Sequence, residues 1–442
     1  MTHSTIQLTD LPDELLLIIF TKLNVIDLFN SLAGINQRLD IILHDPAITN
    51  HLTLFKHSSD DLIHPLDDKI LDRFCLQILP EIHDKIKWLN LELSSMERIF
   101  QVANYPNLSK LGLYNIDEST AGYLFHSMFS NLCDLNFKTS LIYPKQITFN
   151  HLPQQNFFSH NLLQLKINME NFEDCLFVLD GRFNQLHTLD ISLLSIRSNQ
   201  MIQNKEKIVN LKRFTLACDA PTQMYDELII PLLHRMSNLE KLGLYLGTIH
   251  KTKLIDGNDV KKDIIDHLLN LQKFQFNIYS FMFIDNLINL PCYEDIQSSL
   301  KHLGNNKIIS CINYYPKSKM GYCNICSYPC SYAMKNYHYI TNSFPGGSFN
   351  YVRKISLFDE YPFEHDFFIQ ISQSFEFIEA LSLTNLSPQE KKMEKKNLLI
   401  VKFHHLNPLP PNGSPVTHLE NLSIWTDKAS NQDGFFNIVY ST

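Results

Sequence analysis

Long apolar runs, a surplus of basic residues and the signatures of familiar enzymes are all missing from this chain of 442 residues. No stretch of about 18 apolar residues occurs, so the sequence predicts no membrane-spanning helix. The net charge is −8, from 38 Lys and Arg against 46 Asp and Glu. This balance lacks the basic surplus of nucleic-acid-binding domains and of polybasic membrane patches. We therefore expect neither nucleic acid nor a membrane among the partners.

Enzyme motifs are absent as well. The chain contains no Gly-x-Ser-x-Gly, no Walker loop, no Gly-x-Gly-x-x-Gly and no His-Glu-x-x-His. Its Gly-Gly pair at residues 346–347 follows Pro345 and reads as a turn between elements. We expect a protein that is not an enzyme and has no cofactor.

The N-terminus and the cysteines point to the reducing compartments of the cell. Residues 1–5 lack the basic start and apolar core of a secretory signal. Nine cysteines, an odd number, fit reduced and mostly buried thiols better than a disulfide framework. The sequence predicts a location in the cytoplasm, the nucleus or both, and an apolar content of 44% predicts a chain folded nearly throughout.

The most informative stretch near the N-terminus is residues 11–20. Pro12 suits the first turn of a helix, and Asp10 can cap that helix. Six consecutive apolar residues, Leu15 to Phe20, then cover more of the helix than the single stripe that a surface helix buries. The second apolar face needs its own cover, and a partner protein is the natural candidate.

The segment from about residue 8 to residue 46 resembles an F-box, the helical module that docks on the adaptor subunit of SCF ubiquitin ligases. That family has Leu-Pro-x-Glu, an apolar run ending in Phe, a Leu three residues later and a second amphipathic helix. The matching residues are Leu11, Pro12, Glu14, Phe20, Leu23, Leu28, Leu32, Asn36 and Arg38. Leu39 departs from the family, in which an aromatic residue, usually Trp, follows the basic one. The alternative is a hydrophobic helical hairpin that matches by chance.

This resemblance implies the adaptor as a direct partner, with cullin bound through it. It also implies which residues contact the adaptor: Leu11, Pro12, Glu14, Leu15, Ile19, Phe20, Leu23, Leu28 and Asn36. We place the F-box domain at residues 5–50. Residues 51–84 are expected to be linker helices that pack on the following domain, because Leu66, Ile70, Phe74 and Ile78 have helical spacing.

A repeated pattern, apolar-x-x-apolar-x-apolar, runs through the rest of the chain. Its copies begin at Ile86, Leu108, Leu132, Leu162, Leu186, Leu211, Leu239, Leu271, Val352, Ile378 and Leu419. Up to Leu271 the starts are 22 residues (Ile86 to Leu108) to 32 residues (Leu239 to Leu271) apart. Most of these intervals fall in or near the leucine-rich-repeat range of roughly 20 to 29.

The spacing of the pattern predicts a fold. Two apolar residues separated by one point to the same side of a short strand, and helical stretches lie between the copies. Parallel strands joined by helical crossovers stack into a solenoid. The predicted fold class is thus α/β, with an all-α F-box followed by a degenerate leucine-rich-repeat solenoid over residues 85–442 and an irregular insertion near 279–350. An ordinary α/β sheet is the alternative.

A cysteine cluster within the insertion raises the possibility of zinc. Cys311, Cys323, Cys326 and Cys330, with His338, include one Cys-x2-Cys pair. A structural zinc site has two matched ligand pairs, and here one pair stands beside loosely spaced single residues. We therefore expect no metal and keep a zinc-dependent regulatory module as an alternative.

The outward face of the predicted strands combines cationic and aromatic residues. The candidate substrate-binding residues there are Lys110, Tyr114, Arg213, Lys241, Tyr245, Lys273, Lys354 and Phe358. Such a face suits an acidic or phosphorylated peptide. The alternative is a solvated strand face on which Lys is simply frequent.

Together these features predict a non-catalytic substrate-recognition subunit of an SCF-type ubiquitin ligase, in which the F-box binds the adaptor and the repeats bind an unidentified protein substrate. The alternative is a leucine-rich-repeat interaction scaffold that uses its F-box for a non-degradative role.

Overall fold

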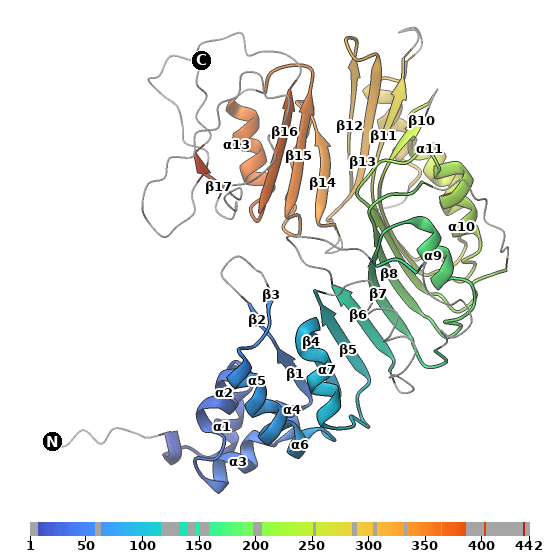
Figure 1. Cartoon of the computed structure of the whole chain (residues 1–442). Helices are drawn as coiled ribbons and strands as arrows, with labels where there is room; N and C mark the ends of the chain where they lie inside the picture. The colour runs from blue at the N-terminus through green and yellow to red at the C-terminus, as the bar shows by residue number, and fades with distance from the viewer. Residues whose placement is uncertain are drawn as a thin grey trace. The chain divides into compact units, whose positions relative to one another are not determined.

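The computed structural model describes residues 8–57, 63–115, 132–138, 147–149, 159–197, 206–250, 253–284, 290–303, 307–330, 334–363, 365–385, 402–403 and 436–437. The chain has a mixed α/β fold with one large, mostly parallel sheet (Figure 1). It divides into two compact units, Met1–Ile191 and Ser192–Thr442.

The first unit opens with a small helical module. Its helices are α1 (Asp13–Phe20), α2 (Val25–Leu32), α3 (Gln37–Leu43) and α4 (Pro46–Thr49), after a 3-10 turn at Leu8–Asp10. The side chains of Asn24, Asn36 and Asp45 accept backbone hydrogen bonds that cap α2, α3 and α4. The N-cap residue of α1 is Pro12, which makes no side-chain cap hydrogen bond.

The helical module is attached firmly to the elements that follow it. The Arg73 guanidinium donates to the carbonyls of Asn30 and Ala33, at 2.7 and 2.9 Å, at the end of α2. The rings of Phe29 and Phe74 meet edge to face, with their centroids 5.9 Å apart. These contacts join the module to α5 (Asp68–Arg73), to the π-helical turn Phe74–Ile78 and to α6 (Leu79–Ile82).

Residues 51–84 are not purely helical, contrary to the prediction. Strand β1 (His51–Leu54) pairs in parallel with β4 (Trp88–Glu92), and β2 (Lys56–His57) pairs with β3 (Ile63–His64). The sequence pattern missed β1 because its apolar residues lie just after α4 and carry no repeat signature.

The large sheet has the strand order β1-β4-β5-β6-β7-β8-β9-β10-β11-β13-β12. Its further strands are β5 (Lys110–Tyr114), β6 (Asp134–Lys138), β7 (Gln164–Met169), β8 (Thr188–Leu193), β9 (Arg213–Cys218), β10 (Lys241–His250), β11 (Lys273–Phe283), β12 (Lys307–Tyr315) and β13 (Met320–Tyr328). The pairing is parallel from β1 through β4, β5 and β6 to β7, and again from β9 to β11, whereas β13 and β12 run antiparallel at the edge.

The repeated sequence pattern has a structural counterpart. The copies from Ile86 to Leu271 coincide with strands β4 to β11. At the start of many strands, two consecutive backbone N–H groups donate to one carbonyl of the neighbouring strand or its lead-in. The accepting residues are Asn50, Lys87, Ser109, Cys133, Leu163, Lys212, Glu240, Lys335 and Arg353. The local geometry therefore recurs along the chain.

The further helices described between strands of the large sheet are short. They are α7 (Leu93–Val102) and α9 (Phe172–Val178) in the first unit, and α10 (Ile230–His234), α11 (Gly257–Val260) and α12 (Tyr293–Leu300) in the second. Helix α10 continues a π-helical turn at Tyr225–Ile229, and another follows α11 at Lys261–Ile265. The helix expected over residues 117–131 and the repeat expected at Leu419 lie outside the described residues.

The last two described repeat copies form a sheet of their own. Strands β14 (Asn336–Ile340), β15 (Lys354–Asp359) and β16 (Ala380–Asn385) pair in parallel, and α13 (His365–Ser374) lies beside them in Figure 1. The predicted solenoid does not continue into these strands, because the hairpin β12–β13, which lies in the predicted irregular insertion, pairs with β11 and ends the run of parallel strands. Strands β17 (Lys402–Phe403) and β18 (Phe436–Asn437) form a separate pair.

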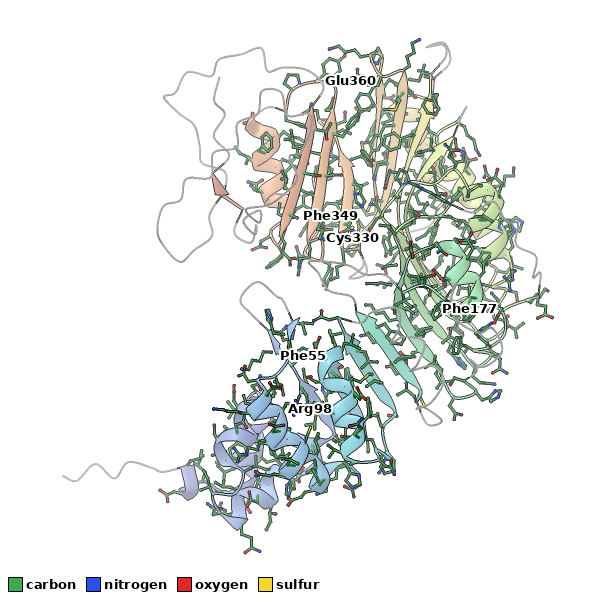
Figure 2. All side chains as sticks on the ribbon, viewed as in Figure 1. Phe55, Arg98, Phe177, Cys330, Phe349 and Glu360 are labelled. Atoms are coloured by element: carbon green, nitrogen blue, oxygen red, sulfur yellow. The ribbon has the colours of Figure 1, made fainter. Side chains whose placement is uncertain are left out.

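An aromatic cluster fills the core between this smaller sheet, α13 and the face of β10 and β13. It contains Tyr245, Tyr337, Phe344, Phe349, Phe363, Phe367, Phe368 and Phe375. Phe349, labelled in Figure 2, is 1% exposed, and its ring stacks on that of Phe375 with centroids 4.8 Å apart. The smaller sheet therefore covers part of the outward face of the larger one.

A buried carboxyl in the first unit makes the stability of the protein depend on pH. The carboxylate of Asp174 accepts hydrogen bonds from the Phe149 N–H at 2.6 Å, from the Thr148 hydroxyl at 3.1 Å and from the Asn171 N–H at 3.4 Å. Burial nevertheless raises the pKa of Asp174 from 3.8 to about 6. The folded state therefore binds this proton more tightly than the unfolded state does.

We expect the stabilising contribution of this proton to be complete below the unfolded pKa and to be lost as the pH rises through about 6. Asp174→Asn removes the titration. The free energy of unfolding of the natural protein, measured relative to Asp174→Asn by urea denaturation, should fall as the pH rises over this interval. A difference that stays constant with pH would contradict the assignment.

Candidate functional site

Helix α1 exposes an apolar stripe to solvent. Leu15, Ile18 and Ile19 are 47%, 59% and 39% exposed, and Leu23, just after the helix, is 53% exposed. Spacings of three and four residues place such side chains on one side of a helix. These four residues are called the α1 stripe.

The opposite side of α1 fixes the helix in its module. Leu16 and Phe20 are buried, at 0% and 2% exposure. Arg38 of α3 donates through Nε to the Asp13 carboxylate at 2.7 Å and through a second nitrogen to the Leu11 carbonyl. The expectation that Leu15 to Phe20 covers more than one face of a helix is thus confirmed, since one part of the run is internal and the other part is open.

The structure separates the nine residues expected to contact the adaptor. Pro12, Glu14, Leu15, Ile19 and Leu23 are exposed, and Leu11 is half-buried. Phe20 and Leu28 are buried inside the helical module, so direct contact between these two side chains and a partner does not agree with the structure. The exposed Asn36 uses its side chain to accept the Leu39 N–H at 2.9 Å.

The predicted contact residues omit four exposed apolar residues of this module, of which Leu8 precedes α1. Ile18 belongs to the same apolar run, Ile35 precedes α3 and Ile41 lies within it. The helical spacing of Leu39, Ile42 and Leu43, which are buried, could have indicated that Ile41 points away from their face.

The predicted cationic residues fall into separate places. Arg213, Lys241 and Lys273 lie in register on β9, β10 and β11, and all three are exposed. Their predicted alignment is confirmed. Lys110 instead lies between Trp88 and Asp134 on β4 and β6.

Lys354 belongs to the smaller sheet, where its neighbours in register are Asn336 and Ala380. This places it on another sheet from the Arg213 row.

The predicted aromatic residues are less accessible than expected. Tyr114 is 8% exposed and its ring lies 4.6 Å from that of Phe55. Tyr245 is 7% exposed and belongs to the aromatic cluster. Phe358 is half-buried. The expectation that Tyr114 and Tyr245 line an open groove is wrong, because neighbouring residues cover these parts of the strands.

The cysteine cluster does not converge on one point. Cys323 and Cys326 lie on the same strand, β13, at an odd separation, so their side chains point to opposite faces of the sheet. Burial raises the pKa of Cys311 to about 12 and raises that of Cys323 as well. Cys326 instead contacts Cys330, with the two sulfurs 3.6 Å apart. The pair that suggested zinc therefore cannot bind one ion together.

A small polar cavity lies in the second unit, beside the smaller sheet. Its volume is about 60 Å³, and Asp219, Asn277, Tyr279, Asn336 and His338 are among its lining residues. The Asn336 amide donates to the Asp219 carboxylate at 2.7 Å. Burial lowers the pKa of His338. Ligand pockets are usually several hundred Å³, so this cavity suits a few water molecules rather than an organic substrate.

No family model matches the chain, and no curated protein matches it significantly in sequence.

In the described part of the chain, none of the helices combines the length and the apolar content needed to cross a lipid bilayer.

Proposed function

We propose that this protein is a non-catalytic substrate-recognition subunit of an SCF-type ubiquitin ligase. In this proposal the helical module is an F-box that binds the adaptor, cullin joins through the adaptor, and the repeated strands, as a degenerate leucine-rich-repeat domain, bind a protein substrate. The single observation that carries the proposal is the α1 stripe directly after Leu11-Pro12-Asp13-Glu14.

The α1 stripe is costly to leave in water. Full burial of a Leu or Ile side chain contributes roughly 1.5–3 kcal/mol, and the stripe holds four such residues within nine positions. A small helical module has no further core in which to place them. A hydrophobic surface of a partner protein, with Pro12 and Glu14 at its border, would bury them.

The attachment of the module supports a scaffold role. The carbonyl of Asn50, directly after α4, accepts the N–H groups of Lys87 and Trp88 at 3.0 and 2.9 Å, which ties the module to the first strands of the sheet. Arg73 ties it to the helices beside them. A ligase receptor needs such stiffness, because the substrate must be held at a defined distance from the subunits that transfer ubiquitin.

The test is affinity purification of the full chain from cells in which the ligase is stalled, followed by identification of the bound proteins. The proposal expects the adaptor and cullin in near-equal amounts, together with a substrate. Adaptor without cullin would favour the non-degradative scaffold, and the absence of both would reject the F-box assignment.

A further inference from the structure

We propose that Arg213, Lys241 and Lys273, here called the basic row, bind one phosphate group on a phosphorylated serine or threonine of a protein segment. The phosphate site follows from the second unit alone, whereas naming the bound protein a substrate rests on the proposed function.

The geometry of the basic row concentrates positive charge. The three residues are direct neighbours in the register of β9, β10 and β11. Adjacent strands lie about 4.8 Å apart, so three cationic side chains start within about 10 Å of each other. Long side chains from such a row can converge on a single group.

The basic row is not neutralised within the described part of the protein. No ion pair joins any of its members to a carboxylate among the described residues. The acidic residue beside it in sequence, Glu240, is paired with Lys212 at 3.1 Å. The positive charge of the basic row can therefore act on a ligand. The three side chains repel one another, and an anionic ligand would relieve that repulsion.

In the first unit, the lysine at the equivalent strand position has neighbours that neutralise its charge. There Lys110 lies between an aromatic residue and an acid. Its ammonium group is 3.8 Å from the Asp134 carboxylate and 5.4 Å from the Trp88 ring centroid. A lysine at this strand position can thus be neutralised by its neighbours, and the basic row lacks that arrangement.

Further along β9, β10 and β11, other side chains cover the sheet face that carries the basic row. The next outward positions are Thr215, Gly243 and Gln275; the Gln275 amide donates to the Pro329 carbonyl at 3.4 Å. A Cβ on Gly243 would lie 3.0 Å from the Thr215 methyl group and 3.2 Å from the Tyr245 ring, so these side chains close over the glycine. A ligand therefore meets the face at its open end, where the strands begin.

The size and extent of the basic row favour one phosphate. A phosphorylated side chain carries about two negative charges and three acceptor oxygens, which suits three donors from a short row. A nucleic acid would need a basic stripe that continues over many phosphates, but the protein carries a net charge of −8.

The test uses the full chain and three degenerate nonapeptide libraries, with phosphoserine, serine or aspartate at the centre. Arg213→Gln/Lys241→Gln/Lys273→Gln is compared with Lys87→Gln/Lys262→Gln/Lys301→Gln, which removes the same charge from exposed positions elsewhere. We expect the natural protein and the control to retain the phosphoserine library at least tenfold better than the serine library. The basic-row variant should lose this preference, and Lys241→Arg should keep it.

Equal retention of all three libraries, or an unchanged preference in the basic-row variant, would overturn the proposal. So would equal binding of the aspartate library or stronger binding of single-stranded RNA. Adaptor binding and thermal unfolding are measured on the same samples. Phosphoserine binding without adaptor binding would leave the phosphate site standing and reject the F-box assignment, while the reverse result would reject only the phosphate site.

Discussion

Replacing Ile19 and Leu23 with Glu should weaken adaptor binding at least a hundredfold while the helical module stays folded. Both side chains are substantially exposed in the free chain, so charge on them costs little there. In a complex each Glu would be desolvated against an apolar surface, which costs far more than the lost contacts alone. A hundredfold change corresponds to about 2.7 kcal/mol of binding free energy. Two residues at the centre of an interface commonly contribute this much.

The matched control is Leu269→Glu. Leu269 is 86% exposed and lies in the second unit, so this substitution adds a charge at an apolar surface position outside the α1 stripe. Binding is measured by capture of purified adaptor, and folding by circular dichroism. Normal capture by the double variant would remove the α1 stripe from the adaptor interface, and equal loss in the control would show that the effect is not specific.

The structure also shows which variants cannot serve this purpose. Phe20→Asp places a carboxylate at a position only 2% exposed, and we expect it to unfold the module. Loss of adaptor binding in that variant would therefore not distinguish a binding residue from a core residue.

Phe349→Ala should lower the free energy of unfolding of the second unit by about 3–5 kcal/mol, the usual cost of removing a buried Phe side chain. Its ring stacks on Phe375 and meets Tyr337 edge to face at 5.2 Å, and it also lies 5.9 Å from the Phe344 ring. The large loss follows because these rings surround one position and cannot all move into the vacated space.

The control for this prediction is Phe283→Ala, at a phenylalanine that is 54% exposed. Chemical denaturation should show a change below about 1 kcal/mol for the control and retained adaptor capture for both variants. A similarly small change for Phe349→Ala would contradict the view that the aromatic cluster holds the smaller sheet in place.

The strands were the most predictable part of this protein. Leu111 and Leu113 show why: two apolar residues separated by one define the buried face of a strand, and that local rule holds wherever the strand is paired. The same rule aligned Lys241 with Lys273, since copies of one pattern pair in the same register.

The covering of the outward face could not be predicted from the pattern. A period of two residues tells which way Tyr245 points but not that a later segment packs over it. The pattern at Val352 likewise predicts a strand without predicting its sheet, because the choice depends on the antiparallel hairpin that ends the earlier run.

The candidate site was predictable in outline only. The apolar run showed that α1 has two apolar faces, but a family pattern does not distinguish residues that bind from residues that support. Phe20 and Leu28 match the pattern and lie in the core, whereas Ile18 belongs to the same apolar run as Phe20 and is exposed.

The most direct measurement is isothermal titration of the purified full chain with the purified adaptor. We expect a one-to-one complex with a dissociation constant below about 1 μM and a negative heat-capacity change, because the α1 stripe is buried on binding. No binding at adaptor concentrations of tens of micromolar, with both proteins folded, would contradict the central claim.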